Sequence, residues 1–524
     1  MKRRILSVLF AVTLILGGCG KNSTTGQTQE NIGTDVVVDD VGNAGQEDTG
    51  ADTTDVTDED DKEETDGTQE EQPQTPDKSV KTYTVNPDTT FQTIGGFGCA
   101  YTWYSDWLFK GKKIDEALDA FFQEGGMSVL RFKNEYEYDR PDYASNAETM
   151  KKYYDGACER LAKIGEKPII LMCCWSPATY LKEGGDRSGN ASLRKNDKGE
   201  YCYEEYGEWW AEAVEYYRNY GIAVDYVSIQ NEVDFAPDYD GCTFAREETD
   251  TQASYAKAYL AVYRAFRERF GDEAPIMIAP ETMSCVATDM LGYVRPIIDA
   301  CPESIGGIAH HLYVGGEGDG DTNTVSPTSF VSHFMETQQF LGEYPLWQTE
   351  YYIGHAIDTA LLINNCLVYE RANYYLYWSG PWADECSTFE NTYLCGTYWS
   401  SNDWKNDHGW RLTADYYAMR HFSEYIRPGY VRIQSLTNDA GIASSAYLSQ
   451  DGNRMVCILI NSTDEERDYV IAPDRECDSS VIFQSVFGLE CENEDDCYQC
   501  LGALPEDRIM TLPAYSVTTI VMNK

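Results

Sequence analysis

Two glutamates stand at the ends of apolar, strand-like segments of this sequence. Glu232 closes the run Ile229-Gln230-Asn231-Glu232, and Glu350 closes Trp347-Gln348-Thr349-Glu350. Two carboxyls of this kind suit the cleavage of a glycosidic bond, because one can protonate the departing oxygen while the other attacks the anomeric carbon or activates water there. A lone glutamate at a strand end is more often part of an ion pair. Two of them, each flanked by Asn or Trp, favour a catalytic pair.

The elements that must position this pair are short apolar segments alternating with amphipathic ones. Eight such alternations of strand and helix within about 300 residues predict a (β/α)₈ barrel. In a barrel of this kind, reactive groups project from the C-terminal ends of the strands. Glu232 and Glu350 would then follow strands four and seven and face each other across the barrel mouth. A doubly wound sheet is the competing α/β interpretation. The predicted strands are 94–100, 128–135, 168–177, 224–232, 275–282, 305–313, 345–352 and 373–380, and the predicted helices include 114–123, 148–164, 204–220, 251–270 and 359–370.

The pattern changes near Arg427-Pro428-Gly429, after which short alternating stretches are divided by polar turns. Such a pattern without helical period predicts an antiparallel β domain, which we interpret as a β-sandwich. We therefore expect a catalytic barrel over residues 92–420 and a side-associated sandwich over 421–524. The strand-like segment within 80–91 precedes the barrel and is expected to pair with the sandwich.

The N-terminal region has the pattern of an export signal followed by a tether. Basic residues 2–4 precede an apolar run, residues 5–16, which is too short to cross a bilayer and suits a signal peptide. The run ends in Leu-Gly-Gly-Cys19, which resembles a bacterial lipoprotein cleavage box and implies a signal over residues 1–18 and a lipidated Cys19. An ordinary secretory signal is the alternative. Residues 19–79 have the composition of an acidic, disordered tether, so we expect an extracytoplasmic protein anchored by lipid to the bacterial cell membrane.

Charge excludes one class of partner. The chain has 41 Lys and Arg against 87 Asp and Glu, a formal net charge of -46. Affinity for nucleic acid comes chiefly from cationic side chains that replace counterions along phosphates, so nucleic acid is not an expected partner. Anionic lipid surfaces are disfavoured for the same reason. We expect a monomer whose membrane contact is its lipid anchor alone.

Several motifs together resemble glycoside hydrolase family 30, from about residue 80 to 524. The resemblance implies that Glu232 is the general acid/base and Glu350 the nucleophile of a retaining hydrolase that uses no cofactor. The xylan-cleaving branch of the family is the most similar, while other members act on β-1,6-glucan, β-1,6-galactan or glucosylceramide. The motifs are Gln92–Gly98, Trp175-Ser176-Pro177 with Tyr180-Leu181-Lys182, Gln230-Asn231-Glu232, Trp347–Glu350 and Phe422–Gly429.

Supporting residues follow from their places after the predicted strands. Asn231 could hydrogen-bond the sugar 2-hydroxyl, and Arg131 could hold Glu350 ionised by its positive charge. Aromatic rings at strand ends could stack on sugar faces or pack in the core. The resemblance gives His311, in the pair His310-His311, a hydrogen-bonding role, and no metal is expected there. The substrate-binding candidates are Asn231, Arg131, Trp175, His311, Tyr313 and Trp378.

Two further patterns are expected to be non-catalytic. Residues 319–323 resemble the start of a calcium loop, but Thr324 and Phe330 replace the Gly and Glu of that loop, so we expect a mobile acidic loop. Cys491, Cys497 and Cys500 lack a fourth zinc ligand and favour disulfides in an exported protein. The adjacent Cys173 and Cys174 are expected to be free and buried.

The substrate is expected to be a plant β-glycan, with β-1,4-xylan favoured by the run FSEYIRPGYVR (residues 422–432). Many xylan-cleaving members read a glucuronic acid branch through an Arg between strand eight and the sandwich, and Arg411 lies in that region. The acidic protein repels glucuronoxylan at long range, which argues against strict dependence on that branch. The alternative class is a non-catalytic surface lipoprotein that binds glycan.

Overall fold

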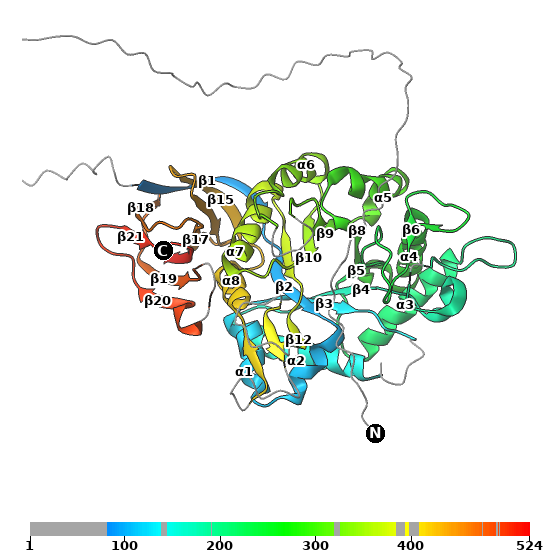
Figure 1. The fold of residues 1–524 in the computed structure, drawn as a ribbon. Helices are drawn as coiled ribbons and strands as arrows, with labels where there is room; N and C mark the ends of the chain where they lie inside the picture. Colours follow the sequence, from blue (N-terminus) through cyan, green and yellow to red (C-terminus); the bar gives the residue numbers. More distant parts are fainter. Residues whose placement is uncertain are drawn as a thin grey trace, which may run out of the picture. The chain divides into compact units, whose positions relative to one another are not determined.

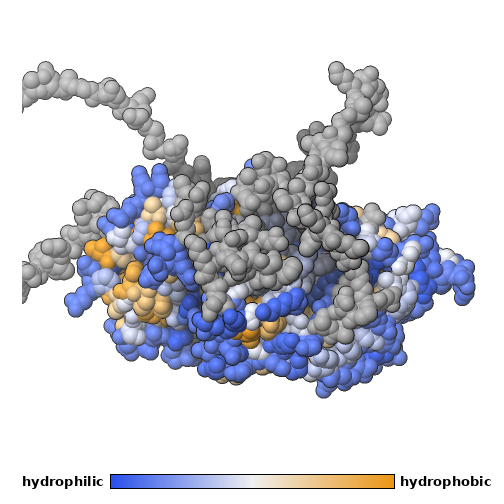
Figure 2. All heavy atoms as spheres, turned by 60° about the horizontal axis from the view of Figure 1, so that its bottom comes forward, coloured by the Kyte–Doolittle hydropathy of each residue, from blue (hydrophilic) through white to orange (hydrophobic). Residues whose placement is uncertain are grey.

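A computed structural model describes residues 81–137, 144–189, 191–318, 325–383, 393–397, 408–473, 475–488, 491 and 493–524. The expected signal peptide, Cys19, the tether and the loop at 319–324 lie outside the described residues. Within the described ranges, no helix is both long and apolar enough to cross a membrane. On the face that Figure 2 shows, hydrophilic residues cover most of the described surface and apolar patches are local.

Eight parallel strands close into a barrel, in the order in which they follow one another along the chain (Figure 1). The last strand, β11, pairs with the first, β2, through Tyr374 beside Gly96 and Tyr377 beside Cys99. Each strand overlaps one of the predicted segments, so the predicted barrel is confirmed and the doubly wound alternative is excluded. The strands are β2 (Gly96–Tyr101), β3 (Val129–Lys133), β4 (Ile169–Cys173), β5 (Tyr226–Ser228), β8 (Ile276–Ser284), β9 (Gly307–Val314), β10 (Leu346–Glu350) and β11 (Tyr374–Tyr377).

Apolar side chains from several strands fill the barrel interior. Trp347 stacks on Tyr374 at a ring-centroid distance of 3.4 Å, next to a buried cluster that includes Val129, Leu171 and Ile278. Branched and aromatic side chains of this kind favour strands, and in a closed barrel those from opposite strands pack against one another. The packed interior leaves the strand ends as the place for polar groups.

Helices surround the barrel strands. The predicted helix 251–270 begins late, at Tyr255, because Ala253–Ser254 pair with Phe244–Ala245 and the Ser254 hydroxyl accepts the Lys257 N–H. The sequence prediction did not include α5, α6 or α8. The helices are η1 (Trp103–Lys110), α1 (Ile114–Leu118) continued by η2 (Asp119–Glu124), α2 (Ala144–Lys163), α3 (Tyr203–Asn219), α4 (Tyr255–Phe270), α5 (Ala287–Ala300), α6 (Val331–Leu341), α7 (Ala356–Asn365) continued by η9 (Cys366–Glu370), and α8 (Ala414–Ser423).

The β-rich domain is a nine-stranded sheet that curls around its own core, which includes Tyr83, Ile433, Leu459 and Ile520. The N-terminal strand β1 pairs antiparallel with β15 and parallel with β18. The strands after Gly429 pair antiparallel with one another, as predicted. The parallel pair comes from β1, which enters the sheet from the other end of the chain. The strands are β1 (Lys81–Thr93), β15 (Val431–Thr437), β16 (Ile442–Leu448), β17 (Arg454–Asn461), β18 (Arg467–Pro473), β19 (Ser479–Val486), β20 (Gln499–Gly502), β21 (Ile509–Leu512) and β22 (Ser516–Asn523).

Among the cysteines that the structure describes, no disulfide bond is formed. The disulfide expected among Cys491, Cys497 and Cys500 is therefore wrong: the Sγ atoms of Cys491 and Cys497 lie 3.7 Å apart, beyond bonding distance. Cys173 and Cys174 are free and buried, as predicted.

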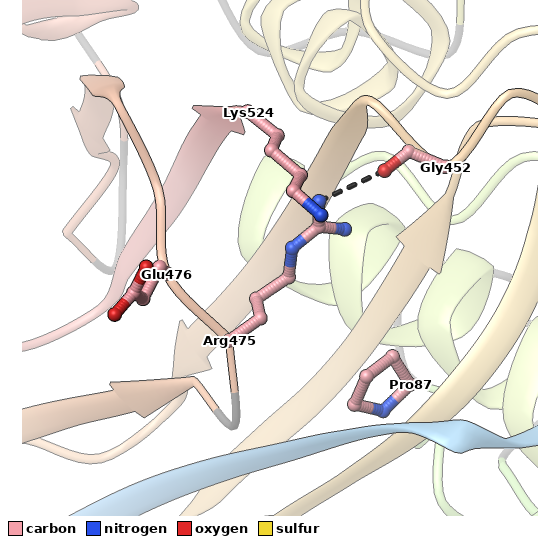
Figure 3. Close-up of a pocket in the computed structure, with 5 residues that line it drawn as sticks. All are labelled: Pro87, Gly452, Arg475, Glu476 and Lys524. Carbon is pink, nitrogen blue, oxygen red and sulfur yellow. Dashed lines mark hydrogen bonds between the residues drawn. The ribbon is translucent and has the colours of Figure 1, made fainter.

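The β domain also carries a surface hollow of about 390 Å³, which Figure 3 shows. Arg475 crosses it and donates from Nη2 to the Gly452 carbonyl at 2.8 Å, with Glu476 and Lys524 nearby. Among the described residues that line it, Glu476 carries the one carboxylate side chain, so these residues form no carboxylate pair. The catalytic chemistry must therefore be sought at the barrel.

The barrel and the β domain meet along α7 and α8, which contact β16, β17, β19 and β22. At the junction, Arg427 pairs with Glu166 and donates to the carbonyls of Gly126 and Ser423 at 3.1 and 3.0 Å. Buried His421 of α8 lies 2.8 Å from the Thr519 hydroxyl and 2.7 Å from the Ser485 hydroxyl. The Phe422–Gly429 motif therefore joins the two parts through buried polar contacts.

We predict that His421 makes the protein less stable in mild acid. Burial, together with the Arg420 charge, lowers the pKa of His421 to about 3, whereas an unfolded histidine has a pKa near 6.5. Between these values the unfolded state binds more protons, so the free energy of unfolding is highest above pH ~6.5 and falls as the pH falls. His421→Gln keeps hydrogen-bonding capacity and removes the titration, so its unfolding free energy should depend less steeply on pH between 6.5 and 5 in denaturant melts. Equal slopes for the variant and the wild type would contradict this.

Candidate active site

Glu232 lies in the turn after β5, the fourth barrel strand. It has a φ of 49°, which is uncommon for a residue with a Cβ. Its backbone N–H donates to the Glu281 carbonyl at 2.9 Å, and the Asn231 N–H donates to the Cys174 carbonyl at 2.7 Å. Neighbouring strand ends thus fix the turn, and they leave the Glu232 side chain only 5% exposed.

Glu350 is the last residue of β10, the seventh strand. The pairing with β9 shifts register here, since Gln348 and Glu350 lie beside the consecutive residues His310 and His311. A bulge of this kind re-aims the side chain at a strand end. The carboxylate accepts from Arg131 Nη1 at 2.6 Å and from the Tyr313 hydroxyl at 3.1 Å.

The structure brings the two predicted carboxylates together. One oxygen of Glu232, one of Glu350 and a ring nitrogen of His311 all lie within 4.8 Å of one another, and all three residues are buried. Strand ends from different parts of the chain thus converge on one small region. The arrangement can deliver a proton and a nucleophile to the same bond.

Arg131 of β3 is fully buried and donates to three side-chain oxygen acceptors. It donates to Glu350 at 2.6 Å, to Asn231 Oδ1 at 2.6 Å, and through Nε to Glu281 Oε1 at 3.0 Å. A guanidinium presents its donors in a fixed fork, so these acceptors are held in one relative geometry. Arg131 has no exposed surface and positions these acceptors; its contact with substrate stays a prediction.

His311 of β9 lies among three carboxylates. Its Nδ1 is 3.1 Å from Glu232 Oε1, and its Nε2 is 3.7 Å from Glu281 and 3.9 Å from Glu350. Burial alone would lower the pKa of His311, but Glu350, Glu232 and Glu281 raise it to about 9. The ring is therefore cationic at neutral pH. Because His311 is fully buried, the expectation that it binds the sugar is replaced by a role toward the carboxylates.

Glu232, His311 and Glu350 are close enough together to suggest a metal site, but their chemistry does not fit one. A metal ligand must be deprotonated, whereas the raised pKa of His311 keeps its ring protonated. Arg131 places a second positive charge against Glu350. The Arg131 and His311 cations already balance the negative charge of the carboxylates, so this cluster is suited to proton transfer.

The pKa of Glu232 is raised, first by burial and then by repulsion from Glu350, while the His311 hydrogen bond works in the opposite direction. A carboxyl with a raised pKa keeps its proton to a higher pH and can donate it. The side-chain oxygen Oδ1 of Asn231, the residue before Glu232, accepts a hydrogen bond from Arg131. The amide NH₂ of Asn231 remains to donate to a ligand.

The predicted aromatic residues differ in how much ring surface they leave for a ligand. Trp175 is only 3% exposed and has the Arg131 guanidinium 4.6 Å from its ring centre, so the expected stacking on a sugar does not fit. The Tyr313 hydroxyl donates a hydrogen bond to Glu350. Trp378 is half-buried beside Trp175 at 6.0 Å and keeps ring surface for a ligand. Half-buried Trp103, which the sequence prediction did not single out, lies 6.3 Å from Trp175.

Sequence reasoning also missed Glu281 of β8, the fifth strand. It is fully buried and bonds Arg131, and the Cys173 thiol donates to it at 2.7 Å. Its pKa is about 2, because Arg131 and His311 outweigh the effect of burial. An acid at the end of the apolar run 275–282 was the signal that could have identified it. Arg411 lies on β14 (Trp410–Leu412), in a small sheet with β12 (Pro381–Ala383) and β13 (Cys395–Thr397) that follows strand eight.

Comparisons with known proteins were made by sequence and by fold. No family model matches the chain. The chain is 23% identical over 464 residues to glucuronoxylanase XynC of Bacillus subtilis (strain 168), a match covering 84% of this chain and 92% of the relative.

Solved structures share the fold. The catalytic domain of a family 30 xylanase C from Talaromyces cellulolyticus matches with a TM-score of 0.64 at 17% identity, over 84% of this chain and all of that one. An endo-β-1,6-glucanase matches with a TM-score of 0.59 at 17% identity, over 85% of this chain and 95% of that one. The sequence match and the shared fold confirm the resemblance to glycoside hydrolase family 30 and to its xylan-cleaving branch, and support an enzyme that hydrolyses glycosidic bonds.

Proposed function

We propose that this protein is a retaining glycoside hydrolase that acts on a β-glycan by double displacement. The observation that carries the proposal is the approach of the Glu232 and Glu350 carboxylates, whose oxygens come within 4.8 Å of each other. Retaining enzymes place the two carboxyls about 5–5.5 Å apart, whereas inverting enzymes leave ~6.5–9.5 Å for a water molecule. The short separation favours retention.

In the first step, Glu232 gives its proton to the departing glycosidic oxygen while a Glu350 oxygen attacks the anomeric carbon and forms a glycosyl ester. In the second step, Glu232 takes a proton from water, the water oxygen attacks the same carbon, and Glu350 leaves as a carboxylate. Arg131 and Tyr313 orient Glu350 throughout. The Asn231 amide is placed to donate to the sugar 2-hydroxyl, a hydrogen bond that strengthens in the transition state.

For the substrate, we propose β-1,4-xylan cleaved at internal positions, with glucuronoxylan included. The sequence similarity to a glucuronoxylanase supports this choice, as do the junction motif and Arg411 after strand eight. A β-1,6-glucan is the alternative that a structural neighbour supports; β-1,6-galactan and glucosylceramide remain as family alternatives. A non-catalytic glycan-binding lipoprotein is disfavoured, because glycan binding alone does not require a protonated carboxyl beside a second, Arg-bound one.

We predict that Glu350→Gln abolishes turnover while the fold persists, because the amide is nearly isosteric and cannot form the glycosyl ester. In Glu232→Ala, azide should restore cleavage of an aryl glycoside with a good leaving group and give a glycosyl azide of retained configuration. Product analysis by NMR checks both variants. Normal hydrolysis by Glu350→Gln, or an azide product of inverted configuration, would contradict the assigned roles.

A second prediction concerns the branch on xylan. If Arg411 binds glucuronate, Arg411→Ala should lose about 1.5–3 kcal/mol of transition-state binding on decorated xylan, the scale of a charge-assisted hydrogen bond. Undecorated xylan should be hydrolysed as before, and it is the control. Equal losses on both polymers would give Arg411 a structural role. Activity on β-1,6-glucan with none on any xylan would exclude the xylanase proposal and leave the retaining mechanism standing.

A third prediction concerns location, for which we propose a lipid-anchored, extracytoplasmic protein. The Leu-Gly-Gly-Cys19 box predicts that the native protein fractionates with membranes and that Cys19→Ser either releases it or leaves its signal uncleaved. Cell fractionation and intact-mass measurement distinguish these forms. Wild-type protein recovered only from the medium would refute the anchor.

A further inference from the structure

Glu281 contacts the catalytic site through both its backbone and its side chain. Its carbonyl accepts the N–H of Glu232 at 2.9 Å. Its own φ is 60°, and the pairing of β8 with β9 shifts register across it, between Pro280 and Thr282. A bulged residue in this conformation is strained unless its surroundings hold it. The strained turn at Glu232 and the strained bulge at Glu281 are thus hydrogen-bonded directly to each other.

The Glu281 side chain is the buried anchor of Arg131. Its Oε1 lies 3.0 Å from Arg131 Nε and 2.9 Å from Nη2, and its Oε2 accepts from the Cys173 thiol at 2.7 Å. With that edge of the guanidinium fixed, Nη1 reaches Glu350 and Nη2 also reaches Asn231. The orientation of the nucleophile therefore depends on a carboxylate that has no exposed surface of its own.

The polar groups around Glu281 come from three barrel strands and one helix. Arg131 approaches from β3, the Cys173 thiol from β4 and the His311 ring from β9, at 3.7 Å. The Tyr255 hydroxyl of α4 is uncharged, since burial and nearby charges, Glu281 among them, raise its pKa. Glu232 and Glu350 are the other two carboxyls beside His311, and the Asp234 carboxylate acts on both Glu232 and His311 from farther away. Glu281 is thus the one carboxylate of the three that is given no bond-making role.

We propose that Glu281 is a positioning residue for glycoside hydrolysis: it holds Arg131 against Glu350 and Asn231, fixes the backbone of Glu232, and supplies the negative charge that balances the Arg131 and His311 cations. This inference rests on the proposed function of Glu232 and Glu350. Because the ionisable groups are coupled, the charge on Glu281 sets the proton occupancy of the whole cluster.

Glu281→Gln tests the charge. Removing one negative charge favours proton release from Glu232 and His311, so the basic limb of the kcat/KM profile on the preferred polysaccharide should move about one unit or more to lower pH. Loosening of Arg131 should lower kcat by roughly 10- to 100-fold, with KM changed less than about threefold. Glu370→Gln is the matched control: Glu370 is equally buried and pairs with His310 outside the catalytic cluster, so its pH limbs should equal those of the wild type.

Glu281→Asp tests the geometry, because it keeps the charge and withdraws the carboxylate by one methylene. The acidic and basic limbs of its kcat/KM profile against pH should stay where they are in the wild type, while kcat falls. A kcat equal to that of the wild type would overturn the positioning role. Thermal melts identify any variant that fails to fold. If Glu281→Gln does not fold, the kcat of the Asp variant decides.

A measurement without substrate separates this inference from the proposed function. The His311 ring resonance, assigned by its absence in His311→Gln, should titrate at lower pH in Glu281→Gln than in the wild type. Unchanged His311 titration together with unchanged pH limbs in Glu281→Gln would overturn the inference while active wild-type protein kept the proposed function. A wild type inactive on every β-glycan would instead overturn the proposed function and, with it, the role of Glu281 in hydrolysis.

Discussion

The burial of the Arg131 guanidinium is the constraint on which the catalytic site depends. A cation removed from water is strongly destabilising unless charged and polar acceptors replace its hydration. Here Glu281, Glu350 and Asn231 supply those acceptors from the ends of three other strands. Closing the barrel is what brings these four strand ends within reach, so the fold and the site require each other.

Around this cation, the protein separates the proton affinities of its carboxyls. Glu281, against Arg131, has a pKa of about 2, while the pKa of Glu232 is raised by burial and by Glu350. His311, whose pKa is about 9, keeps its positive charge between them at neutral pH. One acid thus stays ionised and another tends to hold its proton within a single small cluster. The cluster thus holds both the protonated acid that general acid catalysis needs and the anion that fixes Arg131.

The sequence was sufficient to predict the barrel and to single out Glu232 and Glu350, which the structure brings together. Each depends on a pattern local in the chain: an apolar strand, then a polar residue at its end. Glu281 follows the same rule but went unremarked, since its role is visible only through Arg131, 150 residues earlier in the chain. The register shifts at Glu281 and Glu350 depend on neighbouring strands and leave no periodic signal of their own. The parallel pairing of β1 with β18 was also missed, because it joins segments from opposite ends of the folded chain.

Backbone strain explains why so much buried polar structure supports two carboxylates. Glu232 and Glu281 both have positive φ values, 49° and 60°, a conformation of higher energy for side chains of this size. Each is held by neighbouring strand ends, and the Glu232 N–H on the Glu281 carbonyl makes the two conformations support each other. Relaxing either turn would move a carboxyl by enough to disturb proton transfer or attack. The stability of the barrel therefore maintains the geometry on which the proposed chemistry depends.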